Sequence, residues 1–406
     1  SRTREKKMLS FHSDDIRQNL KPAITRPAFI SEKSTFDRAM MELFEKADII
    51  VGGSRPWDIQ LNTFGVPERI FAHGSLGLGE AYLDGAWDVE NLDEFFDRIL
   101  RAHLDQHVQP LRLIFHALRA RLLNLQNSRR AWQVGKVHYD LGNDFYAAML
   151  DPRMTYTCGY WKDADNLADA QEAKLELICR KLQLMPGMRV LDIGCGWGSF
   201  MGYAAEHYGV SCVGVTISKE QAEWAQKRYA GLPLEFRLQD YRETNERFDR
   251  IVSIGMFEHV GRKNHRTYTE VAHRCLEDGG LFLLHTIGKN VRDTVPDPWI
   301  DKYIFPNGDL PSIGQIADAV DGLFVVEDLH NFGADYDRTL MAWHENFSSA
   351  WPNFSKNLGE RFRRMWNYYL LSCAGAFRAR DIQLWQWVLS KEGVSGRYDR
   401  PDISRD

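Results

Sequence analysis

Residues 188–199 contain three glycines at alternate positions, in the order Met-Arg-Val-Leu-Asp-Ile-Gly-Cys-Gly-Trp-Gly-Ser. The mainly apolar residues 190–193 predict a short buried strand that ends at this glycine cluster. Because glycine has no side chain, the turn lets a ligand approach the backbone closely. A helix over 200–205 should follow, with its first NH groups facing that ligand. The segment therefore predicts a ligand-binding turn between a strand and a helix, and a glycine turn without a ligand is the alternative.

The acidic residue within the end of this strand narrows the class of ligand. Dinucleotide-binding enzymes use a similar glycine-rich turn, so the glycines alone are ambiguous. The order Asp-x-Gly-x-Gly-x-Gly resembles the first motif of S-adenosylmethionine (SAM) methyltransferases, whose ligand has no pyrophosphate. We therefore expect SAM at this turn, held by Asp192, Gly194, Cys195, Gly196, Trp197 and Gly198.

Polar residues also follow the next two predicted strands. In an open α/β sheet, ligands bind outside the carboxyl ends of the strands, so these residues are candidates for the same site. Thr216 and Gln221 stand where an acidic residue usually holds the adenosyl ribose, and they could supply neutral hydrogen bonds instead. Gln239 and Asp240 come after the third strand, where Asp240 could accept a hydrogen bond from an adenine amine.

Two ionisable residues, Glu258 and His285, stand at the ends of the fourth and fifth predicted strands. Each has an ordinary structural interpretation, because a glutamate can cap a turn and a histidine at a strand end is often a satisfied core residue. Two ionisable groups at adjacent strand ends, facing one crevice, are harder to explain in that way. We therefore expect both residues in an active site.

Strand and helix patterns alternate from about residue 132 onward. The predicted strands cover 189–193, 211–215, 234–238, 250–254, 281–285 and 323–327, and helical patterns lie between most of them at 168–182, 219–229 and 266–276. This alternation predicts an α/β fold with a doubly wound, mainly parallel sheet of the Rossmann-like type. A helical region rich in Trp and Phe is expected over 340–390.

The part of the chain before this alternation has a mixed pattern that predicts a smaller α+β domain. Helices are expected over 36–44 and 92–100 and short strands at 49–51 and 59–61, whereas 74–84 is too rich in glycine for one continuous helix. The expected division is a polar leader 1–34, an N-terminal lipid-associated domain 35–127, a linker 128–145, a catalytic domain 146–392 and a polar tail 393–406.

Composition limits the class of protein. The 406 residues are 44% apolar and 26% charged, which is ordinary for a soluble globular protein with room for two domains. No apolar run is long enough to span a bilayer, and no signal-peptide pattern begins the chain. The six scattered cysteines lack metal-ligand spacing, so we expect a reduced cytoplasmic protein without a metal. A net charge of −5 argues against nucleic-acid binding by the whole surface.

One segment departs from this acidic balance. No Asp or Glu lies between Asp105 and Asp140, whereas Arg112, Arg119 and Arg121 do, and apolar residues recur there at helical spacing. A basic amphipathic helix of this kind predicts binding to an anionic membrane surface. The alternative is a helix packed on its own domain with solvated arginines.

Several separate motifs together resemble the cyclopropane-fatty-acyl-phospholipid synthase family. They are 191–198, 257–261, 299–307 and 331–336, with 74–84, 138–143, 160–163 and 377–385 typical of the bacterial phospholipid enzymes. The similarity runs from about residue 38 to 390 and includes the N-terminal domain that the shorter mycolic-acid enzymes lack. We accordingly expect a homodimer in the cytoplasm, peripherally bound to the inner face of the cell membrane, with a membrane phospholipid as substrate.

The resemblance implies methyl transfer from SAM to a cis double bond of an acyl chain, followed by loss of a proton that closes a cyclopropane ring. In the family the base is a bound bicarbonate, whose holders match by position Cys158, Glu258, His285, Tyr336 and the backbone NH of Ile287. The resemblance assigns relay of the proton to Glu258 and orientation of the anion to His285 and Tyr336.

Two cysteines are candidates for a catalytic role, because family descriptions have at times assigned a catalytic cysteine to the position of Cys373. Alkylation of an alkene does not require a thiolate nucleophile, and neither cysteine has a base beside it in the sequence. We expect Cys158 to form a wall of the anion site and Cys373 to be a buried helix residue. The residues before Cys158, Tyr156 and Thr157, are expected at the SAM site by the same resemblance.

Two other functions remain open at this stage. A C-methyltransferase that forms methyl-branched acyl chains would need a reductant, and no nucleotide-reductase motif is visible. A lipid-binding module without turnover would not need the glycine turn together with Glu258, His285 and Tyr336.

Overall fold

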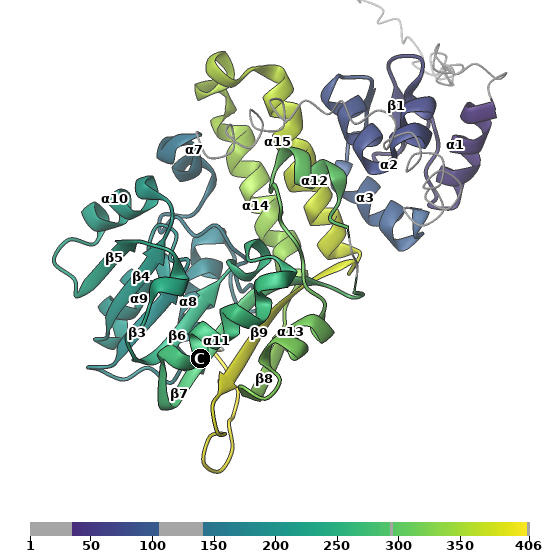
Figure 1. Ribbon diagram of the computed structural model, residues 1–406. Coiled ribbons are helices and arrows are strands. Elements are labelled where there is room, and N and C mark those ends of the chain that lie inside the picture. The colour runs from purple at the N-terminus through teal and green to yellow at the C-terminus, as the bar shows by residue number, and fades with distance from the viewer. Residues whose placement is uncertain (1–34, 105–140, 293–294, 404–406) are drawn as a thin grey trace, which may run out of the picture.

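A computed structural model of the chain describes residues 35–104, 141–292 and 295–403 (Figure 1). A seven-stranded sheet forms the centre of the larger part, and two long helices stand between it and a smaller, mainly helical N-terminal part. The basic segment with Arg112, Arg119 and Arg121 lies outside the described residues, as does the predicted boundary at 127. Among the described residues, no helix combines the length and apolarity that a bilayer crossing needs.

The central sheet confirms the predicted Rossmann-like α/β fold. Its strands are β3 (Arg189–Ile193), β4 (Ser211–Thr216), β5 (Leu234–Leu238), β6 (Phe248–Ile254), β7 (Leu276–Lys289), β8 (Val325–Asn331) and β9 (Ile382–Ser390). They lie in the order β5-β4-β3-β6-β7-β9-β8, and neighbours are parallel except on the two sides of β9. Because the chain runs outward from β3 to β5 and then returns to β6, the switch point of the sheet lies between β3 and β6.

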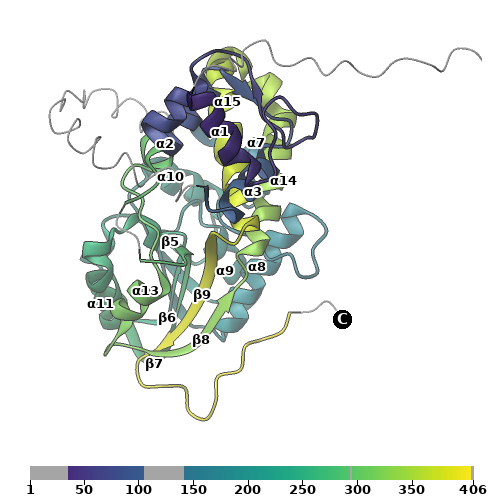
Figure 2. The same cartoon turned by 90° about the vertical axis from the view of Figure 1, so that its right-hand side faces the viewer.

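Helices cover both faces of this sheet (Figure 2). One face carries α8 (Leu167–Lys181), α9 (Ser199–Tyr208) and α10 (Lys219–Arg228), and the other carries α11 (His265–Cys275) and α13 (Ile313–Val320). Within β3, Val190 packs into the core of the first face and Leu191 into the core of the second. Side chains of a strand alternate between its faces, so burial on both sides explains why β3 lacks a polar face.

The region 340–390 is not helical throughout, which corrects the prediction. α14 (Ala334–Ala350) and α15 (Ser355–Arg378) are helices, but residues 382–390 form β9, inserted between β7 and β8. Trp385 and Trp387 pack on one face of the sheet, and Gln386 contacts α8 on the other. Because both faces are buried, β9 lacks the exposed polar side that reveals a surface strand in a sequence.

The N-terminal part is the small α+β unit that the sequence predicts. It holds α1 (Thr35–Glu45), α2 (Val66–Leu83), α3 (Leu92–Arg101) and a pair of two-residue strands, β1 (Gln60–Leu61) and β2 (Trp87–Asp88). The predicted strand at 49–51 is wrong, since these residues form irregular and turn backbone. α2 has non-helical backbone angles at Gly74, so the glycine-rich stretch does interrupt the helix, which resumes after it.

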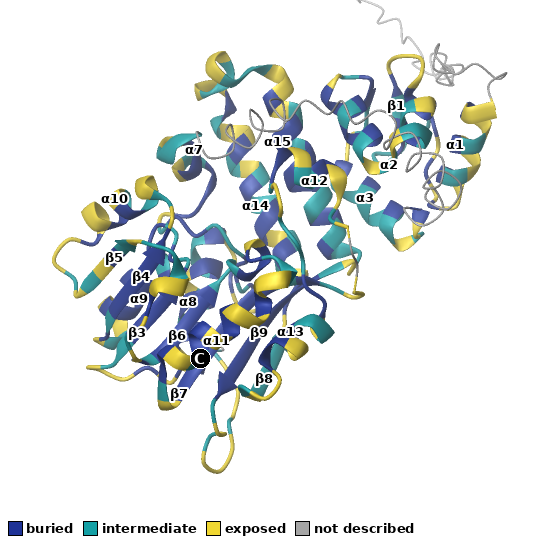
Figure 3. Ribbon diagram, in the orientation of Figure 1, coloured by how far each residue is buried: buried dark blue, intermediate teal, exposed yellow. Residues whose placement is uncertain are grey.

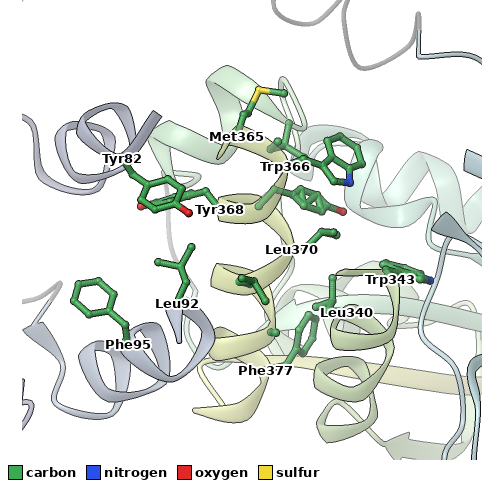
Figure 4. Packing of buried hydrophobic residues seen from close by; sticks show 14 of the residues in the cluster. Tyr82, Leu92, Phe95, Leu340, Trp343, Met365, Trp366, Tyr368, Leu370 and Phe377 are labelled. Atoms are coloured by element: carbon green, nitrogen blue, oxygen red, sulfur yellow. The ribbon is translucent and has the colours of Figure 1, made fainter. Parts of the chain in front are cut away.

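α15 packs between the N-terminal part and α14 (Figure 4). Its Gly375 lies against α3, where a Cβ would come within 2.5 Å of the carbonyl oxygen of Asp93. Further along, the rings of Tyr82 and Tyr368 lie 5.5 Å apart between centroids. Burial is continuous from the sheet through α14 and α15 into the N-terminal helices (Figure 3). The close packing places the N-terminal helices beside the larger part of the chain.

Shorter elements complete the described chain. They are the helices α7 (Gly142–Met149) and α12 (Pro298–Tyr303), and the 3-10 turns η1 (Tyr241–Glu243), η2 (Phe257–His259), η3 (Arg262–Asn264) and η4 (Trp351–Asn353). η2 directly follows β6 and carries Glu258, one of the predicted site residues.

Candidate active site

A cavity of 1890 Å³ lies at the carboxyl ends of the central strands. Its wall includes the turns after β3, β4, β5 and β6, the end of β7, and residues of α2, α3, α14 and α15. Phe71, Leu78 and Phe96 are among the apolar residues that the N-terminal part contributes. The cavity thus runs from the switch point of the sheet to the N-terminal helices.

The glycine turn after β3 borders this cavity at the switch point. Gly194, Gly196 and Gly198 have positive φ angles of 80°, 54° and 78°. A Cβ at Gly194 would lie 2.9 Å from Met256, and one at Gly198 would lie 2.7 Å from the ring of Phe236. A Cβ at Gly196 would meet no atom within 4 Å, because that position opens into the cavity. The space beside Gly196 is therefore open to a ligand. Gly198 instead packs against Phe236 and does not line the cavity.

Asp192 lies one residue before the end of β3, with only 2% of its surface exposed. Its Oδ1 atom has no hydrogen-bond partner in the protein. Burial raises the pKa of Asp192 to about 7, against the attraction of the nearby Lys174 ammonium. A buried polar atom without a partner is unfavourable, so Oδ1 is well suited to accept a hydrogen bond from a ligand.

The residues predicted to hold the adenosine end also line the cavity. Thr216 accepts a hydrogen bond from the Ser218 backbone, and Gln239 donates one to a neighbouring threonine. The carboxylate of Asp240 already accepts from Arg242 at 2.7 Å, so an adenine amine would share this carboxylate. Gln221, in the first turn of α10, is the remaining member of this group.

α8 holds the segment that carries Tyr156 and Thr157, both of which line the cavity. The side chain of Gln171 donates to the Thr157 carbonyl at 2.7 Å, and Lys174 Nζ donates to Thr157 Oγ1 at 2.6 Å. Both side chains are fully buried. Sequence reasoning missed Lys174, and its one signal was a charged residue at the helical spacing of the apolar core positions of α8.

Glu258 is 6% exposed and is fixed on one side only. Its Oε1 accepts a 2.7 Å hydrogen bond from the backbone NH of Ile287, whereas Oε2 has no partner. Burial raises the pKa of Glu258 to about 7, so a substantial fraction is protonated at neutral pH. The Ile287 NH, which the family resemblance assigns to the anion, donates to Glu258 in this structure.

His285 lies in β7 with 1% of its surface exposed. Its Nδ1 is 3.1 Å from Nε2 of Gln386, and its own Nε2 is buried without a partner. Burial, with smaller effects from Lys174 and Lys181, lowers the pKa of His285 well below its usual value, so the ring is neutral. Glu258 and His285 thus bring two unpaired buried atoms into one cavity wall, an arrangement that indicates ligand binding.

Tyr336, from α14, lines the same cavity and stacks on Phe377 with 4.5 Å between ring centroids.

The positions of the two cysteines differ from those expected from the sequence. Cys373, expected to be buried, lines the cavity, whereas Cys158 is fully buried behind the lining and donates to the Gly159 carbonyl at 3.2 Å. Burial raises the pKa of both thiols, that of Cys373 to about 12, so neither is a thiolate at neutral pH.

Sequence comparison assigns the chain to a family. Residues 126–387, more than half of the chain, match the mycolic acid cyclopropane synthetase family. The chain belongs to this family. The cyclopropane-fatty-acyl-phospholipid synthase of Escherichia coli strain K12 is 58% identical to this family member over 360 residues, which cover 88% of this chain and 94% of that protein. A probable fatty acid methyltransferase of Pseudomonas putida is 37% identical over 66% of this chain and 72% of that protein.

Solved structures agree with this assignment. The cyclopropane synthase MmaA2 from Mycobacterium tuberculosis has a TM-score of 0.59 and 35% identity, covering 64% of this chain and 98% of that one. The mycolic acid cyclopropane synthase CmaA1, complexed with SAH and CTAB, has a TM-score of 0.59 and 34% identity, covering 66% of this chain and 100% of that one. This family member is therefore a SAM-dependent methyltransferase, and SAM is its methyl donor.

The N-terminal part distinguishes two groups of relatives. The alignment with the Escherichia coli enzyme spans 360 residues, whereas the family match covers 126–387 and leaves 19 residues after it. That alignment must therefore include residues before 126. The two mycobacterial structures cover about two thirds of the chain, yet they are themselves covered almost completely. The additional N-terminal region is thus shared with the phospholipid synthase.

Proposed function

We propose that this enzyme is a cyclopropane-fatty-acyl-phospholipid synthase, which transfers a methylene group from SAM to the cis double bond of an unsaturated phospholipid acyl chain. The name and high identity of the Escherichia coli relative support the substrate class. The observation that carries the proposal is one cavity that joins the glycine turn, apolar walls from both parts of the chain, and the unpaired atoms of Glu258 and His285.

The proposed chemistry balances without an added oxidant or reductant. The methyl group leaves the sulfonium sulfur of SAM, which keeps the bonding electron pair, and bonds to one alkene carbon. The other alkene carbon becomes a carbocation, and loss of a proton from the new methyl group closes the ring. Because a sulfonium methyl group needs little activation, the main task of the protein is to align donor and alkene where water is excluded.

The described residues divide this task. Gly196 leaves room for the methionine end of SAM, and the unpaired Asp192 Oδ1 can accept from it. Phe71, Leu78 and Phe96 give the far wall the apolar character that an acyl chain requires. The N-terminal part therefore contributes directly to the proposed acyl site.

We further propose that bicarbonate binds beside Glu258, His285 and Tyr336. When bound, it supplies a base that can take up the proton released on ring closure. The residues fit a small oxyanion, because a protonated Glu258 can donate through its unpaired Oε2 and His285 Nε2 also lacks a partner. The hydroxyl of Tyr336 belongs to the same cavity wall.

Lipid mass spectrometry tests the reaction and separates it from the two alternatives. Purified enzyme is incubated with vesicles that contain unsaturated phospholipid and with SAM whose methyl group is deuterated. Ring formation should add a CD2 group, because the transferred CD3 group loses one deuterium when the ring closes. Glu258→Gln serves as a control. In a parallel incubation with a nicotinamide hydride donor added as the reductant, a saturated methyl branch would show a C-methyltransferase. Unchanged lipid with retained vesicle binding would show a binding module.

We also propose that the acid-free segment 106–139 binds an anionic membrane surface. Acyl chains lie beneath the headgroups, so a peripheral enzyme needs a surface anchor. Each basic residue near such a surface contributes about 1 kcal/mol, so replacing Arg112, Arg119 and Arg121 by Glu should weaken binding to anionic vesicles by orders of magnitude. SAM binding should stay intact, and high salt should weaken wild-type vesicle binding. A triple variant that binds vesicles like wild type would place the lipid surface elsewhere.

A further inference from the structure

A row of three polar side chains crosses the antiparallel end of the sheet. His285 in β7 lies directly opposite Gln386 in β9, and Gln386 lies opposite His330 in β8. Residues directly opposite each other in neighbouring strands point to the same face, so the three side chains form one row on the α8 side of the sheet. His285 and Gln386 are buried, at 1% and 0% exposure.

The last residue of α8, Lys181, lies over this row. Its Nζ is 2.8 Å from Oε1 of Gln386 and 2.9 Å from Nδ1 of His330, and its side chain is fully buried. The hydroxyl of Tyr398 donates to the Lys181 backbone carbonyl at 2.8 Å, which anchors the end of the helix. No step of the proposed reaction uses Lys181 or Gln386.

The chemistry of the donors fixes the direction of every bond in the row. A lysine ammonium has donors only, so the Gln386 amide must turn its oxygen toward Lys181. The amide NH2 group then faces His285, 3.1 Å from Nδ1. An NH2 group donates, so Nδ1 of His285 must accept and cannot carry the proton. In the neutral ring the proton consequently resides on Nε2, the atom without a partner in the protein.

We propose that Lys181 and Gln386 are positioning residues that hold His285 in the tautomer protonated on Nε2, so that the ring donates a hydrogen bond to an oxyanion in the cavity. The inference deepens the proposed function and rests on it for the identity of the anion. In the opposite tautomer, Nε2 would present a lone pair to the anion and repel it. The buried ammonium of Lys181 therefore determines, through Gln386, which ring nitrogen of His285 carries the proton.

The neutral state of His285 is a second requirement. Burial lowers its pKa well below its usual value, so the ring has one proton to place. Burial also lowers the pKa of Lys181 to about 7, so the ammonium form prevails at pH 6. In the ammonium form, the direction of the bond from Lys181 to Gln386 has no alternative.

Nuclear magnetic resonance of ligand-free enzyme, labelled with ¹⁵N in histidine, reads the tautomer directly at pH 6. Protonated and bare ring nitrogens give distinct signals, and His285→Asn identifies the signals of this ring by their loss. Wild type should carry the proton on Nε2. Gln386→Glu should move it to Nδ1, because a carboxylate only accepts and draws the proton to its side. Lys181→Met should give a mixture of the two His285 tautomers. Lys162→Met replaces an exposed lysine and should leave the tautomer unchanged.

Activity gives an independent reading. Gln386→Glu should lower kcat by about 10-fold or more and raise the bicarbonate concentration needed for half-maximal rate, while the Kd for SAM and the melting temperature stay near wild type. Gln386→Glu with wild-type activity at low bicarbonate would overturn the proposal. A wild-type ring protonated on Nδ1, or a tautomer unchanged in Gln386→Glu, would overturn it as well. Because the spectra need no substrate, failure of the proposed reaction and failure of this inference are distinguishable.

Discussion

Two regions of this enzyme differ in how their charged groups are paired. In the cavity wall, the ionisable side chains of Asp192, Glu258 and His285 are buried, and each has one polar atom without a protein partner. At the contact between α15 and the N-terminal part, charged groups are paired. Arg364 donates to the Asp88 carboxylate at 2.8 Å, and the guanidinium of Arg378 lies 2.7 Å from an oxygen of Asp93.

The difference separates binding from architecture. An unpaired buried polar atom costs about 1–3 kcal/mol, and a bound ligand that pairs with it recovers this free energy. A paired charge has its partner within the protein, and removing that partner destabilises the fold. Variants in the cavity wall should therefore affect ligand binding and turnover, whereas variants at the α15 contact should affect folding alone.

The largest expected effect is on turnover. Glu258→Gln and Tyr336→Phe preserve shape but remove a carboxylate or a hydroxyl, so kcat should fall by roughly 10²–10⁴ with little change in the fold. Steady-state assays of methyl transfer measure the effect, and Glu235→Gln, an exposed carboxylate of β5, is the matched control. Added bicarbonate should partly restore Tyr336→Phe, where only the affinity for the anion is weakened. Full activity in both variants would show that the anion site lies elsewhere.

Donor binding should be nearly as sensitive. In Gly196→Val the side chain would enter the space that the turn leaves open, so the Kd for SAM should rise at least about 100-fold, or ~2.7 kcal/mol. Titration calorimetry measures this change. Gly322→Val is the matched control, because Gly322 also has a positive φ angle, of 70°, with nothing within 4 Å, and lies outside the cavity. Equal SAM affinity in the two variants would refute the assignment of the turn.

Glu258→Gln should also change the pH dependence of stability. The pKa of Glu258 is raised from 4.5 to about 7 in the folded state, so between these values the folded state binds more protons than the unfolded state. The free energy of unfolding therefore falls as pH rises, by up to about 3 kcal/mol once Glu258 ionises above pH 7. Glu258→Gln cannot ionise and should be more stable than wild type at pH 8, but not at pH 4. Urea denaturation at both pH values checks the sign, and a less stable variant at pH 8 would contradict it.

The smallest effect should appear at the paired region. Arg364 donates to the carbonyl of Trp87 at 2.9 Å as well as to Asp88, and its side chain is 17% exposed. Arg364→Leu should lower the free energy of unfolding by about 1–3 kcal/mol, because the Trp87 carbonyl and the Asp88 carboxylate lose this donor. The Kd for SAM should not change, since Arg364 is not in the cavity wall. A large loss of SAM affinity without loss of stability would break the distinction between the two regions.

Structural features that are encoded by residues close together in the chain could be predicted from the sequence. The glycine turn after β3 and the position of Glu258 just after β6 were predicted correctly, because short runs of residues encode them. His285 was expected at the end of a strand, but β7 continues beyond it to Lys289. β9 was missed, since burial on both faces removes the polar alternation that marks a surface strand. Lys181 and Gln386 were missed because their bond joins residues 205 positions apart, and no local pattern reveals such a contact.

The cysteines illustrate a different limit. Cys373 lines the cavity and Cys158 lies behind its wall, although the expectation was the reverse. Which face of α15 meets the cavity depends on how that helix packs against α3, where Gly375 allows close approach. Helical periodicity gives the apolar face of a helix, but not which of several neighbours covers it.

The position of β9 has a consequence for biosynthesis. Among the described strands β9 is synthesised last, yet it lies between β7 and β8 rather than at the edge of the sheet. While the chain emerges from the ribosome, β7 and β8 therefore each expose an unpaired edge, the kind of surface that promotes aggregation. Only the arrival of β9 closes this gap and brings Gln386 beside His285. A nascent chain that lacks β9 cannot assemble the oriented histidine, so catalytic competence should begin only after β9 has been translated and has left the ribosome.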